Sequence, residues 1–305
     1  MESPDLQPDA DPVLEDSLVL DLVRRFVPDA RAVLSVDESG GEARAYMVDE
    51  DLVLKTQRPY RLRPRTSVEK EARFLDELGR ANVSVPRNLG YGREAGVEFL
   101  VLTRMPGIAL ATAGRLPWRA RSLTALGRTM RAIHSIDQSF AASELFPGDL
   151  HATDLRSRLA TTLENVLSSG SWSDQLLDGL TREEVVIRLL DATPTDMLPV
   201  ALHANPGPSH MFVDPASGEF TGLIDFADAF RSHPALDLAA WPAEDLEPIL
   251  AGYVEDGPLP DTFEAALHLG RLNRILNSML KRLAREGGTT LDVEAVLTDA
   301  LVKVR

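Results

Sequence analysis

The chain has 305 residues, enough for one large domain or for two closely joined lobes that each bury a core. Its 47 acidic and 32 basic side chains give a formal net charge of −15, which disfavours nucleic acid and anionic membranes as partners because their phosphates would be repelled. The same excess would attract a polycationic ligand, although a solubilising surface also explains it. The absence of cysteine excludes disulfides and thiolate metal sites.

The beginning of the printed sequence does not resemble a secretory signal. Residues 1–12 are acidic and contain proline, whereas a signal peptide has a basic and an apolar region. No apolar run approaches the roughly 20 residues that a membrane span requires. We therefore expect a cytoplasmic protein without a membrane partner.

The first part of the sequence predicts a helix followed by strands. The helix is expected over residues 13–26, where apolar side chains share one face as far as Phe26, and Pro28 ends it. Short extended runs separated by turn residues then predict an antiparallel meander. Its strands are expected over residues 32–36, 43–48 and 52–56.

An amphipathic helix and a buried strand complete this region. The helix is predicted over residues 66–78, where apolar side chains recur every three or four positions. The strand is predicted over residues 98–105, and Pro106-Gly107 supplies turn chemistry after it. We therefore expect an N-terminal lobe of residues 1–106 and a C-terminal lobe of residues 107–305.

The second lobe is predicted to be mainly helical, with a short strand region in its middle. Apolar stripes predict helices from residue 117 and around residues 155–163, 183–190, 243–254 and 260–285. Strands are expected over residues 200–203, 210–213 and 222–225, with a hairpin turn at residues 214–218. Loops between such strands are common places for chemistry.

Charged residues in the first lobe are candidates for a nucleotide site. Lys55 lies in the third extended run, and Glu71 lies on the next helix, with Glu69 as a second choice. Kinase-like folds present a phosphate-binding lysine and a paired glutamate in this order. Gly40 and Gly41 occupy the place of a phosphate-covering turn, although glycines are common in hairpins. The plainer interpretation of the lysine is a solvent-facing strand end.

The most informative stretch lies in the second lobe. It reads His203-Ala-Asn205-Pro-Gly-Pro-Ser-His210, then Gly222-Leu-Ile-Asp225, then His233-Pro-Ala-Leu-Asp237. This spacing resembles that of the aminoglycoside phosphotransferases. Their catalytic loop carries a histidine, an aspartate and a metal-binding asparagine, and the second metal-binding residue, an aspartate, follows the next hairpin. Together with Lys55, Glu71 and the segment 102–107, the resemblance runs from about residue 30 to residue 255.

The resemblance implies an α+β, bilobal protein-kinase-like fold, with a small antiparallel-sheet N-lobe and a larger, mainly helical C-lobe. It also implies a small-molecule kinase that uses ATP or GTP with magnesium and a hydroxyl acceptor, for which a polycationic aminoglycoside is one candidate. The residues carried over are catalytic Asn205 and His203, cofactor-binding Lys55, Glu71, Gly40, Gly41, Arg104 and Met105, metal-binding His210 and Asp225, and substrate-binding Asp228. A histidine at position 210 is unexpected for magnesium, which prefers oxygen ligands.

Three further positions have structural interpretations. Asp237 is expected to hydrogen-bond the backbone near the catalytic loop, and the same role is the alternative to catalysis for His203. His134 lies on an apolar helix and is expected to be a packed core residue, not a ligand. Asp228 is expected either to reach the acceptor or to cap a turn.

Asn205 stands where the resembled family has its catalytic aspartate. An amide accepts a hydrogen bond from a substrate hydroxyl, but it does not take the proton and carries no charge. Three interpretations stay open: an enzyme weakened at this step, a nucleotide-binding pseudokinase, and an engineered inactive form. A structural or interaction protein that binds no nucleotide is the remaining class.

Overall fold

The computed structural model describes residues 11, 13–61, 66–94, 96–114, 117–146, 154–169, 172, 177, 179–195, 199–286 and 293–304. Its described residues divide into two compact units. The first unit extends to Ser122 and also contains residues 208–229, and the second contains residues 123–207 and those from Phe230 onward. This division differs from the expected boundary at residue 106.

The first unit is built on a five-stranded antiparallel sheet with the order β1-β2-β3-β5-β4. Its strands are β1 (Val33–Asp37), β2 (Ala43–Val48), β3 (Leu52–Gln57), β4 (Asn88–Glu94) and β5 (Val97–Thr103). The predicted meander is therefore confirmed, and the strand expected at 98–105 is β5. β4 was not predicted as a separate strand, because its two glycines weaken the β-propensity signal.

Two helices accompany this sheet. α1 (Asp16–Arg24) buries Val19, Leu22 and Val23 completely, in one apolar cluster with strand residues. The helix is shorter than predicted, and Phe26, which was expected on its buried face, is 38% exposed beyond its end.

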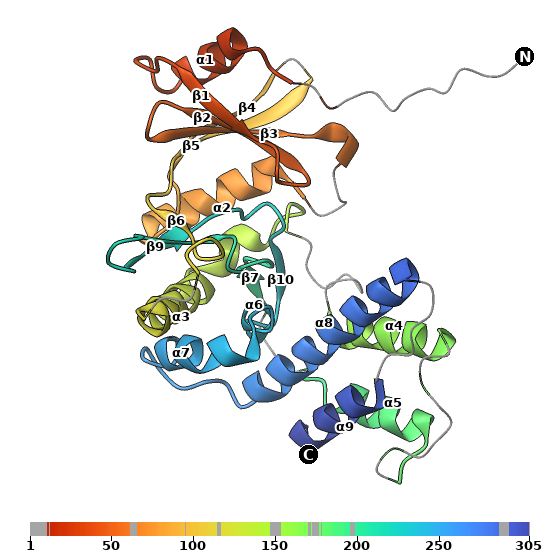
Figure 1. The fold of residues 1–305 in the computed structure, drawn as a ribbon. Helices are drawn as coiled ribbons and strands as arrows, with labels where there is room; N and C mark the ends of the chain where they lie inside the picture. The colour runs from red at the N-terminus through yellow and green to blue at the C-terminus, as the bar shows by residue number, and fades with distance from the viewer. Residues whose placement is uncertain are drawn as a thin grey trace, which may run out of the picture. The chain divides into compact units, whose positions relative to one another are not determined.

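α2 (Val68–Arg80) begins at Ser67, whose hydroxyl accepts a hydrogen bond from the Lys70 N–H. This N-cap fixes the start of the helix two residues after the predicted position. In Figure 1, α2 lies along the sheet. The short 3₁₀ turn η1 (Pro59–Arg61) follows β3.

A second, three-stranded sheet explains why residues 208–229 belong to the first unit. Its order is β6-β8-β9, with β6 (Ile108–Ala109), β8 (Met211–Val213) and β9 (Phe220–Leu223). Gly107 has φ of +92°, and a Cβ there would lie 2.2 Å from the Val213 carbonyl oxygen, so the close pairing of β6 with β8 requires glycine. The expected hairpin turn is confirmed, since the Asp214 carboxylate accepts hydrogen bonds from the backbone N–H groups of Ala216 and Ser217.

The described part of the second unit is mainly helical, as predicted. Its helices are α3 (Arg119–Ser135, with residues 119–122 in the first unit), α4 (Leu155–Ser168), α5 (Arg182–Asp191), α6 (Ala235–Leu238), α7 (Ala243–Tyr253), α8 (Phe263–Glu286) and α9 (Val293–Lys303), with the 3₁₀ turn η2 (Gln138–Ala141). The antiparallel pair β7 (Val200–Leu202) and β10 (Phe230–Ser232) lies beside them in this unit. α6, α9 and β10 were not predicted.

Close helix packing holds this unit together. α8 packs against α4, α6 and α9, and α4 and α9 both contact α5 (Figure 1). α3 and α7 approach closely at two glycines, because a Cβ on Gly127 would lie 2.0 Å from the Ile249 carbonyl oxygen and one on Gly252 would lie 1.9 Å from that of Thr124. Among the described residues, no helix has both the length and the apolar character that crossing a membrane demands.

Candidate active site

A lysine between two carboxylates forms the centre of the site in the first unit. Lys55 Nζ lies 2.6 Å from Glu71 Oε2 and 2.6 Å from Asp225 Oδ1. The lysine is on β3, the glutamate is in the first turns of α2, and the aspartate follows β9. The pair predicted from the sequence order, Lys55 with Glu71, is thus present, and Glu69 instead contacts Arg93.

Backbone and ring contacts fix the segment after β9 against α2. The Phe226 N–H donates to Glu71 Oε1 at 3.2 Å, so the glutamate contacts both the lysine and this segment. The rings of Phe74 and Phe226 pack edge to face with centroids 5.2 Å apart. The Ser67 N–H donates to the Ala227 carbonyl oxygen. α2 therefore carries Glu71 to the aspartate segment as well as to Lys55.

The electrostatics of this cluster are those of a buried ion pair with one accessible carboxylate. Burial alone would lower the pKa of Lys55, but the Asp225 and Glu71 carboxylates outweigh it and raise this pKa. Burial raises the pKa of Glu71, and the adjacent lysine opposes this. The Glu71 side chain is only 2% exposed, whereas that of Asp225 is 40% exposed. Asp225 is therefore the carboxylate available to a ligand.

Asp225 also has an unusual backbone conformation. Its φ is +72°, in the left-handed region that residues other than glycine seldom adopt, although aspartate tolerates it better than most. The strand expected over 222–225 is therefore displaced by two residues, because β9 begins at Phe220 and ends at Leu223. This turn directs the carboxylate toward Lys55. Such conformations cluster at functional sites.

A cavity of about 470 Å³ surrounds the cluster, and the described residues that line it all belong to the first unit. A pocket of this size falls in the range of small-ligand sites. Predicted residues that line it are Gly40, Gly41, Lys55, Glu71, Arg104, Met105, His210, Asp225 and Asp228. Thr66, which the sequence analysis did not single out, also lines it and donates from its hydroxyl to Asp228 Oδ1 at 2.9 Å.

The donor set fits magnesium only in part. Magnesium usually takes one or two protein carboxylates together with phosphate oxygens and water, and Asp225 meets that requirement. The Nε2 atom of His210 lies 3.4 Å from Asp225 Oδ2, but an imidazole nitrogen is not the oxygen ligand that magnesium prefers. Within the described ranges, no group of three or more His, Asp or Glu side chains is arranged to hold a metal.

The predicted catalytic residues lie in the second unit, directly after β7. His203 is fully buried, and its Nδ1 accepts a hydrogen bond from the Asn205 N–H at 3.3 Å. Ala204 between them has φ of +74°. Asp237 is 1% exposed and accepts from the N–H of His203 at 2.8 Å and from that of Ala204 at 2.7 Å. The expected backbone role of Asp237 is confirmed.

A buried chain of hydrogen bonds holds Asp237 in turn. His134 Nε2 lies 3.1 Å from Asp237 Oδ2, and His134 Nδ1 lies 2.9 Å from the Tyr253 hydroxyl oxygen. His134 is 7% exposed, so its expected core position is confirmed. The link to Asp237 was not predicted, because these residues are distant in the sequence and no spacing signal joins them.

The sheet-based unit with its lysine–glutamate pair, the helical unit and the loop after β7 define a protein-kinase-like architecture. The chain matches the family model described as the phosphotransferase enzyme family over residues 33–266, and it belongs to that family. This confirms both the resemblance inferred from the sequence and the α+β fold class.

Solved structures share this fold at low sequence identity. The GDP complex of wild-type aminoglycoside 2'-phosphotransferase-IIIa is 20% identical, with 95% of this chain and 98% of that chain covered and a TM-score of 0.63. The macrolide 2'-phosphotransferase MphH from Brachybacterium faecium, as apoenzyme, is 21% identical, with 93% and 98% covered and a TM-score of 0.61. Spectinomycin phosphotransferase APH(9)-Ia, in complex with ADP and spectinomycin, is 10% identical, with 96% and 98% covered and a TM-score of 0.60.

Proposed function

We propose that this protein binds ATP or GTP and transfers the γ-phosphoryl group to a hydroxyl of a small molecule, at a rate reduced by Asn205. The observation that carries the proposal is the contact of Lys55 with Glu71 and Asp225 inside the first-unit cavity. Phosphoryl transfer needs a cation for the phosphates and a carboxylate for their metal ions. This cluster supplies both.

The cavity residues have distinct roles in nucleotide binding. Lys55 would bind the α- and β-phosphates, with Glu71 holding its ammonium group in place. Gly40 and Gly41 would allow the phosphates to approach the turn between β1 and β2. Backbone groups at Arg104 and Met105 would contact the base.

Asp225, with His210 beside it, would hold magnesium, which when bound neutralises charge on the phosphate oxygens. The carboxylate meets the oxygen preference of that ion, and the imidazole does not. The chain's own contribution is therefore concentrated in Lys55 and Asp225, which meet at 2.6 Å.

Asn205 sets the expected rate. Its amide would orient the acceptor hydroxyl, while proton removal would pass to solvent or phosphate because an amide is no base. General-base assistance is worth about 10²- to 10⁴-fold in rate. His203 would act with Asn205 by fixing the loop, as its hydrogen bond with the Asn205 N–H supports.

The acceptor class is proposed only as a small molecule with a free hydroxyl. Similar folds are named for aminoglycoside, macrolide and spectinomycin substrates, so the fold itself does not select one acceptor. Asp228 would contact an ammonium group if the acceptor is cationic. The alternative function is nucleotide binding without turnover, and the observation that favours it is Asn205 itself.

A transfer assay distinguishes these functions. γ-labelled ATP and GTP are incubated with the parent protein or Lys55→Met, together with magnesium and a panel of cationic, neutral and anionic hydroxyl compounds. Labelled product that depends on Lys55 supports the enzyme. Nucleotide binding without transfer supports the alternative, and absence of both rejects the two functions together.

A further inference from the structure

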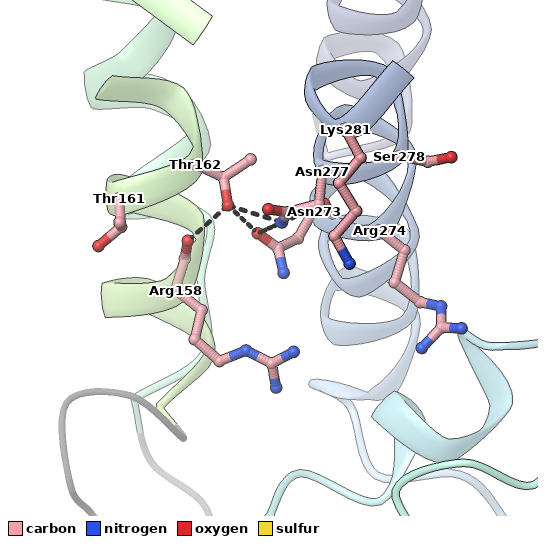
Figure 2. Close-up of a pocket in the computed structure, with 8 residues that line it drawn as sticks. All are labelled: Arg158, Thr161, Thr162, Asn273, Arg274, Asn277, Ser278 and Lys281. Carbon is pink, nitrogen blue, oxygen red and sulfur yellow. Dashed lines mark hydrogen bonds between the residues drawn. The ribbon is translucent and has the colours of Figure 1, made fainter. Parts of the chain in front are cut away.

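A second cavity, of about 600 Å³, lies between α4 and α8 in the second unit. Figure 2 shows side chains from both helices around it. Its lining residues are Arg158, Thr161, Thr162, Asn273, Arg274, Asn277, Ser278 and Lys281. None of the residues predicted for the nucleotide or acceptor site is among them.

The lining is positively charged. Among the described residues, the lining contains Arg158, Arg274 and Lys281 and no Asp or Glu, in a chain whose net charge is −15. The other five lining residues in this part of the chain are neutral hydrogen-bonding side chains. Arginine and lysine are the usual ligands of carboxylate and phosphate groups, and arginine binds them through two parallel hydrogen bonds. A polycationic compound would be repelled from this cavity.

Buried hydrogen bonds hold the polar wall between the helices. Thr162 and Asn273 are 3% and 4% exposed, and Thr162 Oγ1 lies 2.6 Å from Asn273 Oδ1. Asn277 Nδ2 donates to Thr162 Oγ1 at 2.8 Å and to the Asn273 carbonyl oxygen at 2.8 Å. In Figure 2 the Asn273 amide nitrogen points away from Thr162. This wall is therefore arranged before any ligand binds, which lowers the ordering cost of binding.

The two arginines are placed by their surroundings. The Arg158 guanidinium carbon lies 5.6 Å from the centroid of the Phe230 ring, a cation–π contact. Burial lowers the pKa of Arg274, partly offset by Asp237, while nearby Arg271 adds to the lowering. Arginine nevertheless stays charged in proteins, and Arg274 is exposed on α8, so an anion in the cavity can reach its guanidinium.

The same contacts connect the cavity with the loop that carries Asn205. Phe230 begins β10, which pairs with β7, and that strand directly precedes His203. Asp237, whose charge acts on Arg274, accepts the backbone hydrogen bonds of this loop. The cavity and the loop therefore share one framework within the second unit.

We infer that the α4–α8 cavity binds a small molecule that carries an oxyanion, a carboxylate or a phosphate, together with hydroxyl groups. As a site for the acceptor, the inference rests on the proposed function; as a binding site it stands without it. The Arg and Lys side chains would bind the oxyanion, and the Thr, Asn and Ser side chains would hydrogen-bond the hydroxyl groups. This is opposite in charge to the polycationic acceptor considered from the sequence.

The test is calorimetric titration of the full chain with glycerol 3-phosphate, inorganic phosphate and kanamycin, at low and moderate salt. Saturating Mg-ADP is present in a parallel series, so that phosphate bound at Lys55 is recognised by its displacement. We expect glycerol 3-phosphate to bind most tightly, inorganic phosphate more weakly, and kanamycin not to compete.

Variants locate the binding. Arg274→Gln and Lys281→Gln should each weaken glycerol 3-phosphate by about tenfold, since each removes a charge-assisted contact. Arg274→Lys keeps the charge but not the two parallel hydrogen bonds, so it should lose less affinity than Arg274→Gln, and Arg188→Gln, an exposed charge on α5, should leave the affinity unchanged. Thermal melting confirms that each variant is folded.

Three results would overturn the inference. They are the absence of saturable phosphate binding, equal losses in Arg188→Gln and the cavity variants, and competition by kanamycin. Equal affinity for the two phosphates would contradict the hydroxyl contacts. Failure of the proposed function is read separately, in the labelled-transfer assay, whereas oxyanion binding in this cavity is measured without transfer and should be the same with and without Mg-ADP.

Discussion

The two units carry different parts of the proposed site, and only the part in the first unit has all of its expected charged residues. In the first unit, Lys55 meets both of its carboxylate partners at 2.6 Å. In the second unit, Asp237 supports the loop through two backbone hydrogen bonds, yet the loop presents an amide at Asn205. The charges that we propose bind phosphate and the loop framework are thus both present, while the carboxylate expected to accept a proton is not.

This difference separates binding from turnover. Lys55 is buried together with the two carboxylates that compensate its charge, and losing either partner would leave a costly, poorly compensated buried charge. Asp237, His134 and Tyr253 form a hydrogen-bonded chain that supports the loop. We expect this chain to hold the loop geometry whether or not residue 205 is a base. We therefore propose that the first unit binds the nucleotide and that the Asn205 side chain lowers the rate of phosphoryl transfer.

The largest expected effect comes from placing a carboxylate at residue 205. Asn205→Asp should raise the rate of phosphoryl transfer by about 10²- to 10⁴-fold, because the carboxylate would accept the hydroxyl proton. Nucleotide affinity should change little. The measurement is the transfer of labelled phosphate to an acceptor that gives detectable product with the parent protein. If no acceptor gives product with the parent, the full panel of acceptors is used. Asn205→Ala is the matched control, and an aspartate variant no faster than that control contradicts the account.

Acid should weaken the second unit through His233. Burial, with the charge of His134 added, lowers the pKa of His233 to about 4, and its Nδ1 accepts the Ala235 N–H. Because the unfolded chain protonates this histidine near its ordinary pKa of about 6.5, the stability it contributes is full above that pH and is lost as the pH falls toward 4. The loss should be roughly 3 kcal/mol.

Urea titrations at pH 7 and pH 4.5 measure this effect. His233→Gln should show a smaller fall in the free energy of unfolding between the two pH values than the parent does. An identical fall in both proteins would mean that this histidine is not the acid-sensitive group.

The framework of the loop is tested at Asp237. In Asp237→Asn, the amide NH₂ would face one of the two N–H donors, so we expect a loss of about 2 kcal/mol of stability. Hydrogen exchange at residues 203–205 should become faster. Asp191→Asn, at a surface carboxylate, serves as control and should stay within about 0.5 kcal/mol of the parent. Unchanged exchange in the Asp237 variant would show that the loop does not depend on these bonds.

The smallest expected effect is on stability and concerns the start of α5 in the second unit. Thr181 and Glu184 form a capping box at the start of α5. Thr181→Ala should lower the free energy of unfolding by about 1 kcal/mol without altering nucleotide affinity. Chemical denaturation and calorimetry measure the two quantities. A parallel loss of nucleotide affinity would contradict the assignment of binding to the first unit.

Periodicity and turn chemistry predicted the longer elements well. The meander, α2 and five helices of the second unit follow from apolar spacing, and Lys55 and Glu71 follow from their order along the chain. The short elements β6, β10 and α6 carry too few residues for a periodic signal. The grouping of residues 208–229 with the first unit was not predicted, because the pairing of β6 with β8 joins segments that are far apart in the sequence.

The site was predictable only where a motif was available. The approach of Asp225 to Lys55 came from family resemblance, since no local pattern joins the two positions. The cavity between α4 and α8 was not predicted, because Arg158, Arg274 and Lys281 each look like ordinary solvated helix residues. Only the packing of the two helices reveals that their charges line one cavity.

The most direct test of the central claim is a calorimetric titration of the parent and Lys55→Met with Mg-ATP and Mg-GTP. The account predicts saturable binding of at least one nucleotide to the parent, and a loss of affinity of about tenfold or more when the lysine charge is removed. Absence of binding to the parent, or equal affinity in both proteins, would contradict the claim that Lys55 and Asp225 form a nucleotide site.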